Sequence, residues 1–134
     1  DNSWATPLYF HPLKHGVDIS MQALTKYVGG HSDAMMGALL FSEEKLFQRV
    51  CNTQRNTGHY VSAHDVYAML KGLRTMEARL SQHQQSAIEI ARWLEAQPRV
   101  KKVIYPPLIS DEGHRLWKRD FTGANGLLSF ILDK

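Results

Sequence analysis

The sequence predicts an α/β fold, because segments with strand patterns alternate along the chain with segments that have helical patterns. Residues 34–41 are continuously apolar, which is typical of a strand buried on both faces of a sheet. Residues 62–97 place their apolar side chains on one stripe of a helix. Residues 100–105 then return to β-branched and aromatic side chains, which favour a strand.

The beginning of the chain is predicted to lead into a pair of strands. Residues 1–16 contain two prolines and a glycine without a steady period, which indicates a loop with a short helical turn. Residues 17–22 alternate apolar and polar side chains, the pattern of a half-buried strand. Residues 23–33 include two adjacent glycines and form the predicted loop between this strand and the one at residues 34–41.

Two capping patterns then predict two helices. Ser42 is the expected N-cap of the first helix, with two glutamates in the first turn where the helix dipole favours anions. That helix is expected to end near Arg55, before Gly58. Ser62 followed by Asp65 has the spacing of a second capping pair, which starts a helical pattern that continues to about residue 97.

The rest of the chain is predicted to enter a second domain. Gly72 marks an expected bend in the long helical pattern, and Pro98 ends it. A strand at residues 100–105, a short helix at 112–118 and a final strand at 127–132 follow. We therefore expect the chain to pass into a second domain near residue 96.

Composition excludes several classes of protein. Of 134 residues 43% are hydrophobic and 22% are charged, as in ordinary globular domains. No apolar run reaches the roughly 18 residues that a membrane span needs. The net charge of +3 comes from scattered basic residues without a basic stripe, which disfavours nucleic-acid binding. The single cysteine, Cys51, cannot form an internal disulfide, which fits a cytoplasmic location.

The ends of the sequence indicate an excerpt from a longer polypeptide. The chain begins at Asp1 rather than at a methionine, and the strand-forming run at residues 127–132 stops two residues before the end. Intact domains rarely begin and end inside their own core elements. We therefore expect flanking sequence on both sides.

The segment around Lys26 carries the most chemical information. This lysine directly follows a predicted strand, and hydroxyl groups and glycines surround it. A nucleophilic lysine needs a rigid base and room for a flat ligand, and the Thr25 hydroxyl with nearby backbone N–H groups is suited to a phosphate. By itself, however, a Thr-Lys pair in a loop with glycines is more often an ordinary surface turn.

Residues 18–32 taken together resemble the cofactor-attachment signature of the Cys/Met-metabolism family of pyridoxal-phosphate (PLP) enzymes. That signature has an acid and an aliphatic residue, a gap, small residues, then Thr-Lys-aromatic-aliphatic and Gly-His-Ser. The resemblance implies that Lys26 carries pyridoxal 5'-phosphate as a Schiff base and acts as general base, with Thr25 among the cofactor-binding residues. The matching positions are Asp18, Ile19, Ala23, Thr25, Lys26, Tyr27, Val28, Gly30, His31 and Ser32.

A second landmark lies at the start of the chain. Residues 1–4, Asp-Asn-Ser-Trp, resemble the family's Asp-Asn-Thr-aromatic segment. The resemblance implies that Asp1 pairs with the pyridine nitrogen of PLP. A carboxylate in that position keeps the ring protonated, and the protonated ring is the electron sink for a substrate carbanion. Ala23 departs from relatives that have a serine there to contact the phosphate.

The resemblance also implies a fold and an arrangement of domains. The fold is the aspartate-aminotransferase-like α/β fold of type I PLP enzymes. Residues 1–96 would form the C-terminal part of the large PLP-binding domain, including a long inter-domain helix, and residues 97–134 the beginning of the small domain. The tyrosine that stacks on the ring and the arginine that clamps the substrate carboxylate would lie outside this sequence.

Softer markers resemble the carbon–sulfur β-lyase branch of the family, whose members cleave cystathionine to homocysteine, pyruvate and ammonia in methionine biosynthesis. They include Trp4, and residues 117–123. The implied partners are a small sulfur amino acid as substrate and further copies in a homotetramer, with no nucleic acid and no membrane. A γ-synthase or γ-lyase of the same family, or a structural piece without activity of its own, remain the alternatives, and we expect the 134 residues alone to be inactive.

The remaining reactive side chains favour structural roles. His31 is expected to be a structural hydrogen-bonding residue rather than a proton carrier. The seven histidines do not match the spacing of metal ligands, so we expect no metal site. Cys51 has no paired histidine and is expected to be passive.

Overall fold

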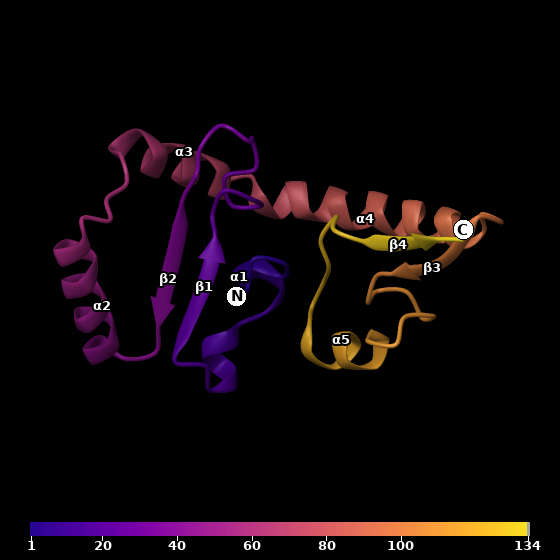
Figure 1. Cartoon of the computed structure of the whole chain (residues 1–134), viewed down its shortest axis with the longest axis horizontal. Helices are drawn as coiled ribbons and strands as arrows, with labels where there is room; N and C mark the ends of the chain where they lie inside the picture. Colours follow the sequence, from indigo (N-terminus) through magenta and orange to yellow (C-terminus); the bar gives the residue numbers. More distant parts are fainter. Residues whose placement is uncertain (134) are drawn as a thin grey trace. The chain divides into compact units, whose positions relative to one another are not determined.

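A computed structural model describes residues 1–133 of the chain. The chain divides into two compact units (Figure 1). Unit 1 comprises Asp1–Pro7 and His11–Met76, and unit 2 comprises Leu8–Phe10 and the chain from Glu77 onward. The predicted domain boundary near residue 96 concerns the domains of a longer protein and stays a prediction.

Unit 1 contains a two-stranded antiparallel sheet. Strand β1 (Ile19–Ala23) pairs with strand β2 (Gly37–Phe41), with Met21 opposite Leu39. Both strands were expected, but the prediction that the second is buried on both faces is wrong for this chain, because Leu39 and Leu40 are exposed. Residues 24–36 fold back as a turn instead of crossing over through a helix, so the two strands run antiparallel.

The burial of β1 is the reverse of its apolar pattern. The polar residues Ser20 and Gln22 are buried, whereas Ile19 and Met21 on the opposite face are exposed, Met21 at 45%. Gln22 is only 1% exposed, and neither its amide nitrogen nor its amide oxygen has a hydrogen-bond partner among the described residues. A buried polar group in this state is costly, so Gln22 is the least satisfied side chain of the strand.

The segment before β1 contains two short helical turns, where a loop with one such turn was expected. Helix α1 spans Thr6–Tyr9, and the 3₁₀ helix η1 spans Pro12–His15. Thr6 is fully buried and has a positive φ of 58°. Such a backbone conformation is rare for a β-branched residue and persists only where the surrounding structure fixes it.

Helix α2 (Glu44–Thr57) begins later than its sequence suggests. The prediction that Ser42 is the N-cap is wrong, because Glu43 occupies that position and makes no capping hydrogen bond with its side chain. The N–H and hydroxyl of Ser42 both donate to the carbonyl of Asp18, at 3.0 and 3.2 Å, so Ser42 closes the end of the sheet instead. The predicted end is confirmed, with Gly58 as a left-handed C-cap.

The long helical pattern is split into two helices. Helix α3 (Ala63–Leu73) starts at the predicted cap, where the Asp65 N–H donates to the Ser62 hydroxyl at 3.0 Å. Helix α4 spans Met76–Glu95. The expected break is present, but it lies just after Gly72, which is itself inside α3.

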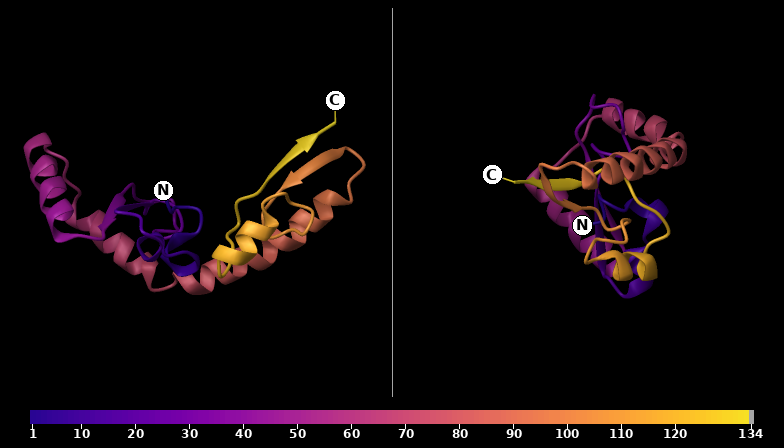
Figure 2. Two further views of the ribbon diagram at one scale, coloured as in Figure 1. Left: turned by 90° about the horizontal axis from the view of Figure 1, so that it is seen from below. Right: turned by 90° about the vertical axis from the view of Figure 1, so that its right-hand side faces the viewer.

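Unit 2 contains the second antiparallel sheet. Strand β3 (Val100–Ile104) pairs with strand β4 (Ser129–Leu132), and helix α5 spans His114–Asp120. These elements agree with the predicted strands and short helix. The sheet lies along α4 (Figures 1 and 2). The core of unit 2 is formed by one face of α4, by β3 and by the loops on either side of α5. Its buried residues are Leu80, Ala87, Ala91, Leu94, Val103, Tyr105, Leu108 and Ala124.

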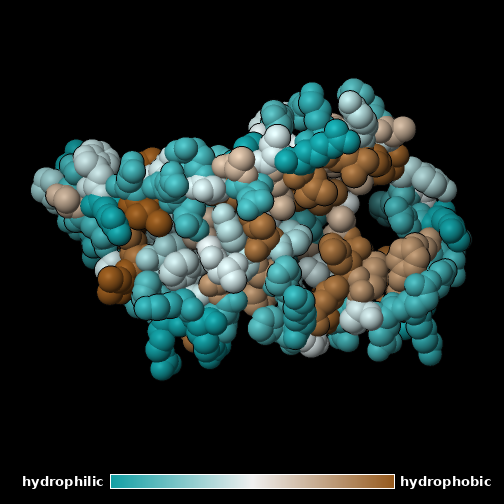
Figure 3. Space-filling view, turned by 180° about the vertical axis from the view of Figure 1, so that it is seen from behind, coloured by the Kyte–Doolittle hydropathy of each residue, from teal (hydrophilic) through white to brown (hydrophobic). Residues whose placement is uncertain are grey.

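Apolar surface remains exposed on both units. Brown apolar side chains form several patches on the face drawn in Figure 3. The exposed large apolar residues include Ile19, Met21 and Leu39 in unit 1, and Trp93 and Ile109 in unit 2. None of the helices described in residues 1–133 is long and apolar enough to cross a membrane.

Candidate functional site

Lys26 lies in a tight turn that directly follows β1. The Lys26 N–H donates to the Ala23 carbonyl at 3.4 Å, and the Gly29 N–H donates to the Leu24 carbonyl at 2.7 Å. The Gly30 N–H then donates to the Lys26 carbonyl at 2.8 Å, and Gly30 has the positive φ of 77° that this turn requires. The lysine therefore projects from a backbone that is fixed by hydrogen bonds on both sides.

The Lys26 side chain is exposed and available. Among residues 1–133, its amine forms no hydrogen bond and no ion pair. A primary amine on a rigid base, with no carboxylate holding it, is what covalent chemistry with an aldehyde requires. The Schiff-base role of Lys26 stays a prediction.

The Thr25 hydroxyl links the start of the loop at residues 24–36 to its end at Met36. It donates to the Met36 carbonyl at 3.2 Å and accepts the Met36 N–H at 3.0 Å, and the Thr25 N–H donates to that carbonyl at 3.2 Å. A hydroxyl has one hydrogen to donate, so contact with a phosphate requires the bond to the Met36 carbonyl to break. The structure thus gives Thr25 a structural role, and its phosphate contact stays a prediction.

The N-terminal segment lies beside β1 (Figure 1). The Asn2 N–H donates to the Met21 carbonyl at 2.8 Å, and the Ala23 N–H donates to the Ser3 hydroxyl at 2.7 Å. One carboxylate oxygen of Asp1 accepts the Ser3 N–H at 2.7 Å, which ties the side chain to this segment. These bonds place the segment that begins at Asp1 alongside β1, the strand that leads into the Lys26 turn.

The His31 side chain forms a hydrogen bond within the same loop. Its Nδ1 lies 2.7 Å from the Gly29 carbonyl oxygen, which can only accept, so Nδ1 carries the hydrogen. Ser32, the next residue, has a positive φ of 57°. This hydrogen bond agrees with the structural role expected for His31.

Helix α3 packs directly against the lysine turn, a feature that sequence reasoning missed. The predicted role of Gly72 is a bend in the helix, whereas the structure places it against the backbone of Val28 and Gly29. Met69, one helical turn earlier, has its sulfur beside Gly29. The glycine in an otherwise regular helical pattern was the available signal, since such a glycine indicates a close approach of backbone as readily as a bend.

The chemistry of these groups fits PLP. The free amine of Lys26 suits the aldehyde of the cofactor, and the Asp1 carboxylate suits its protonated ring nitrogen. Within residues 1–133, no group of three or more His, Cys, Asp or Glu side chains could hold a metal ion. The ionisable groups predicted to hold the cofactor are one amine, that of Lys26, and one carboxylate, that of Asp1.

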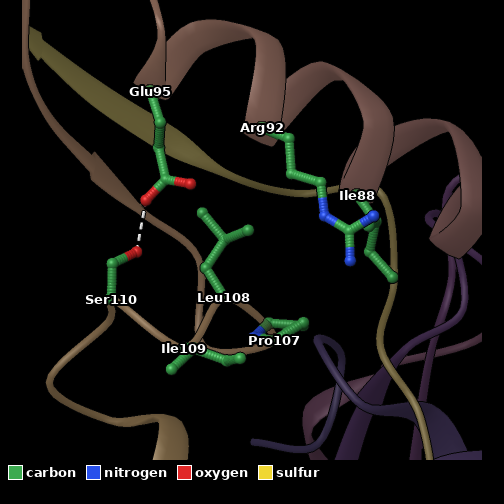
Figure 4. A pocket seen from close by; sticks show the side chains of 7 residues that line it. All are labelled: Ile88, Arg92, Glu95, Pro107, Leu108, Ile109 and Ser110. Carbon is green, nitrogen blue, oxygen red and sulfur yellow. Dashed lines mark hydrogen bonds between the residues drawn. The ribbon is translucent and has the colours of Figure 1, made fainter.

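A groove in unit 2 lies apart from these residues in the sequence. Its volume is about 460 Å³, and it is lined by Ile88, Arg92, Glu95, Pro107, Leu108, Ile109 and Ser110 (Figure 4). The Ser110 hydroxyl donates to the Glu95 carboxylate across one end. None of the residues predicted to bind the cofactor lines this groove.

Known proteins resemble the chain along its whole length. A family model described as "Cys/Met metabolism PLP-dependent enzyme" matches residues 1–134. Curated relatives include an L-alanine/L-glutamate racemase of Wolbachia pipientis, 46% identical over the whole chain, and a putative cystathionine beta-lyase of Rhizobium johnstonii, 48% identical over 98% of it. A cystathionine beta-lyase of Escherichia coli is 42% identical over the whole chain.

The solved structures agree in fold. A cystathionine gamma synthase from Xanthomonas oryzae pv. oryzae, solved in complex with cystathionine, matches the whole chain with a TM-score of 0.96 and 35% identity. The match covers 35% of that protein, and the chain spans about a third of the length of the curated relatives. The predicted α/β fold class, that of the PLP-dependent enzymes of this type, is confirmed.

Proposed function

Because the chain belongs to the Cys/Met-metabolism family of PLP-dependent enzymes, we propose that Lys26 anchors the cofactor in a carbon–sulfur β-lyase. The proposed enzyme cleaves cystathionine to homocysteine, pyruvate and ammonia. Support for this reaction comes from the relatives named cystathionine beta-lyase, at 42% and 48% identity. The observation that carries the proposal is the unpaired Lys26 amine on its hydrogen-bonded turn.

Lys26 has two tasks in this proposal. Its Nζ would hold the cofactor covalently, and the same amine, when free, would accept the proton from the substrate Cα. The turn suits both tasks, because its backbone is fixed while the exposed lysine side chain keeps its rotamer freedom.

Asp1 provides a negative charge to pair with the protonated ring nitrogen of PLP. Bound PLP supplies an electron sink for the carbanion at the substrate Cα. The Asp1 carboxylate keeps the proton on the ring nitrogen, and the Ser3 N–H holds one of its oxygens in place. A fixed carboxylate costs no reorganisation when charge develops in the ring.

Other reactions of the family use the same two groups. A γ-synthase or γ-lyase also starts by removing the Cα proton, and one similar structure is named a gamma synthase. Racemisation needs only removal and return of that proton, and one curated relative is named an L-alanine/L-glutamate racemase. The β-lyase reaction is the leading proposal because that name recurs among the relatives.

The test uses the full-length enzyme that contains this chain. Borohydride reduction of the enzyme with PLP bound, followed by peptide mapping, should place the pyridoxyl group on Lys26. Pyruvate release from cystathionine should exceed both condensation of O-acylhomoserine with cysteine and racemisation of L-alanine or L-glutamate. Lys26→Ala should lose on the order of 10²–10⁴-fold in turnover. A label on another lysine would refute the anchor, and faster condensation or racemisation would refute the β-lyase assignment.

The predicted setting of the enzyme is part of the proposal. We propose a homotetramer in the cytoplasm with a small sulfur amino acid as substrate. The exposed apolar side chains of unit 1, such as Met21 and Leu39, support further contacts with chain outside these 134 residues or with other copies. Sedimentation of the full-length enzyme measures the oligomeric state directly.

A further inference from the structure

We infer that Gly72 and Met69 of α3 are positioning residues for Lys26, because together they set the place of the turn that carries it. This inference rests on the proposed function of Lys26. It assigns a role to a helix that supplies none of the groups predicted to touch the cofactor. The contacts all lie within unit 1.

Gly72 allows the helix to touch the backbone of the turn. A Cβ atom at position 72 would overlap the carbonyl oxygens of both Val28 and Gly29, and it would lie 2.9 Å from the Gly29 carbonyl carbon. Real Cβ atoms do not approach other atoms this closely. The atoms in the way belong to backbone, which cannot swing aside as the end of a side chain can. Any side chain at position 72 must therefore separate the helix from the turn.

Met69 fills the other side of the same contact. A Cβ at Gly29 would lie 3.0 Å from the Met69 sulfur and 3.1 Å from the Leu24 carbonyl oxygen. Met69 is only 4% exposed, and Val28 is also buried. The contact is thus close-packed from both sides, and such packing transmits displacement instead of absorbing it.

The helix itself does not require a glycine at position 72. The positive-φ glycines of the chain are Gly16, Gly30 and Gly58, so Gly72 keeps a backbone conformation that alanine adopts readily. Inside a helix, glycine is less favourable than alanine. The reason for a glycine here is therefore the approach of the turn, since the conformation of α3 supplies none.

A shift of this contact reaches Lys26 through the turn's hydrogen bonds. Gly29 is bonded to Leu24 on one side of the lysine, and Gly30 is bonded to the carbonyl of Lys26 itself. Residues 24–30 therefore move together when Val28 and Gly29 are pushed away from α3. A misplacement of about 1 Å in a catalytic group can cost on the order of 10²-fold in rate.

The main test is Gly72→Ala in the full-length enzyme, with Gly37→Ala as the matched control. Gly37 also lies in unit 1, but a Cβ there meets nothing closer than the Gln22 carbonyl at 3.8 Å and its φ is not positive. Three quantities are measured: the rate of PLP loss, the pH midpoint of the absorbance band of lysine-bound cofactor, and kcat and KM separately.

Gly72→Ala should lose PLP at least about tenfold faster than wild type, shift the pH midpoint of the band, and lower kcat by on the order of 10²-fold. Gly37→Ala should change none of these. The shifted pH midpoint is the decisive reading, because a general loss of stability does not change the protonation of a cofactor that is still bound.

A second pair of variants covers the case in which Gly72→Ala does not fold. Met69→Ala removes the packing beside Gly29 without inserting an atom, and Met69→Leu restores most of the volume. Met69→Ala should shift the pH midpoint and speed PLP loss, and Met69→Leu should recover most of both. Met35→Ala is the control, since Met35 is 84% exposed.

The outcomes separate this inference from the proposed function. If Gly72→Ala folds and keeps the wild-type pH midpoint and rate of PLP loss, the positioning role is wrong. If it does not fold, unchanged values for Met69→Ala have the same meaning. In both cases borohydride labelling of wild-type Lys26 would leave the proposed function standing, whereas a label elsewhere removes the basis of both.

Discussion

At the scale of single residues, the candidate site is built by hydrogen bonds of the main chain. Asp1 and Lys26 are 25 positions apart, and hydrogen bonds of the Asn2 N–H and the Ser3 hydroxyl with β1 place the segment that begins at Asp1 alongside the strand that leads to Lys26. The Lys26 amine forms no hydrogen bond within residues 1–133, while the residues on either side of it fix the backbone of the turn through their own hydrogen bonds. The Thr25 hydroxyl differs from this amine, since it donates its one hydrogen to the Met36 carbonyl and accepts the Met36 N–H.

The first prediction concerns the charge of Asp1. In the full-length enzyme, Asp1→Asn keeps the shape of the side chain but removes the negative charge that holds the ring proton. We expect kcat to fall on the order of 10²–10³-fold, the range typical for loss of one preorganised electrostatic contact. Asp33→Asn, on the exposed part of the loop, is the control and should leave kcat unchanged. Steady-state pyruvate release measures both, and equal rates for the two variants would remove Asp1 from the site.

The second prediction concerns Tyr9 and alkaline pH. Burial, with a smaller contribution from the Glu77 carboxylate, raises the pKa of Tyr9 above its usual value near 10.0. The unfolded chain therefore releases this proton first, and stability is complete below pH 10 and falls as the pH rises through the folded-state value. Urea unfolding of wild type and Tyr9→Phe between pH 8 and 11 measures the effect. The wild type should lose more stability than the variant above pH 10, and parallel curves would contradict the prediction.

At the scale of secondary structure, elements with local signals were predictable and their burial was not. The Ser62–Asp65 cap, the Gly58 terminus and the strand after Pro98 are all set by neighbours in sequence. The Thr-Lys-Tyr signature is a local signal of the same kind, and the role it gives Lys26 stays a prediction.

Features that depend on distant contacts were missed or misread. Ser42 has the chemistry of an N-cap, yet it bonds to the Asp18 carbonyl because the start of β1 lies next to it. Apolar Met21 is exposed and polar Gln22 is buried, because burial follows what covers each face of the sheet and not the pattern of the strand itself. The role of Gly72 was hidden for the same reason, since its partners are about 43 positions earlier in the chain.

A third prediction tests the cap of α3. Ser62→Ala removes the acceptor of the Asp65 N–H and the partner of the Asp65 carboxylate. The free energy of unfolding should fall by about 1 kcal/mol, as for other serine caps. Ser81→Ala, at an exposed position inside α4, is the matched control and should not destabilise the protein. Urea midpoints of the two variants decide the matter, and equal midpoints would mean that the cap contributes nothing.

At the scale of the whole molecule, the described chain leaves much of its apolar surface uncovered. The β1–β2 sheet has apolar side chains on its outer face, and unit 2 exposes Trp93 and Ile109. The chain also spans about a third of the length of its curated relatives. Both observations favour a site that needs groups from outside these 134 residues.

The fourth prediction follows from these two observations. Residues 1–134, produced alone and mixed with PLP and cystathionine, should release pyruvate at less than about a tenth of the full-length rate, because holding and orienting the substrate contributes much of the rate. A coupled lactate dehydrogenase assay measures the release, and light scattering in the same sample measures association through the uncovered sheet. A rate within tenfold of the full-length enzyme would show that Lys26 and Asp1 suffice.

The contact at Gly72 also has a consequence for engineering. Replacing glycines inside helices by alanine is a standard way to raise thermostability, typically by about 0.4–1 kcal/mol at compatible positions. A propensity-based survey of this chain would select position 72 of α3 early, where the alanine methyl would meet main-chain oxygen. At position 37 in β2, the same methyl would make only an ordinary van der Waals contact, 3.8 Å from the Gln22 carbonyl oxygen. A stabilised variant that is also meant to work should therefore carry its alanine at position 37 and keep its glycine at position 72.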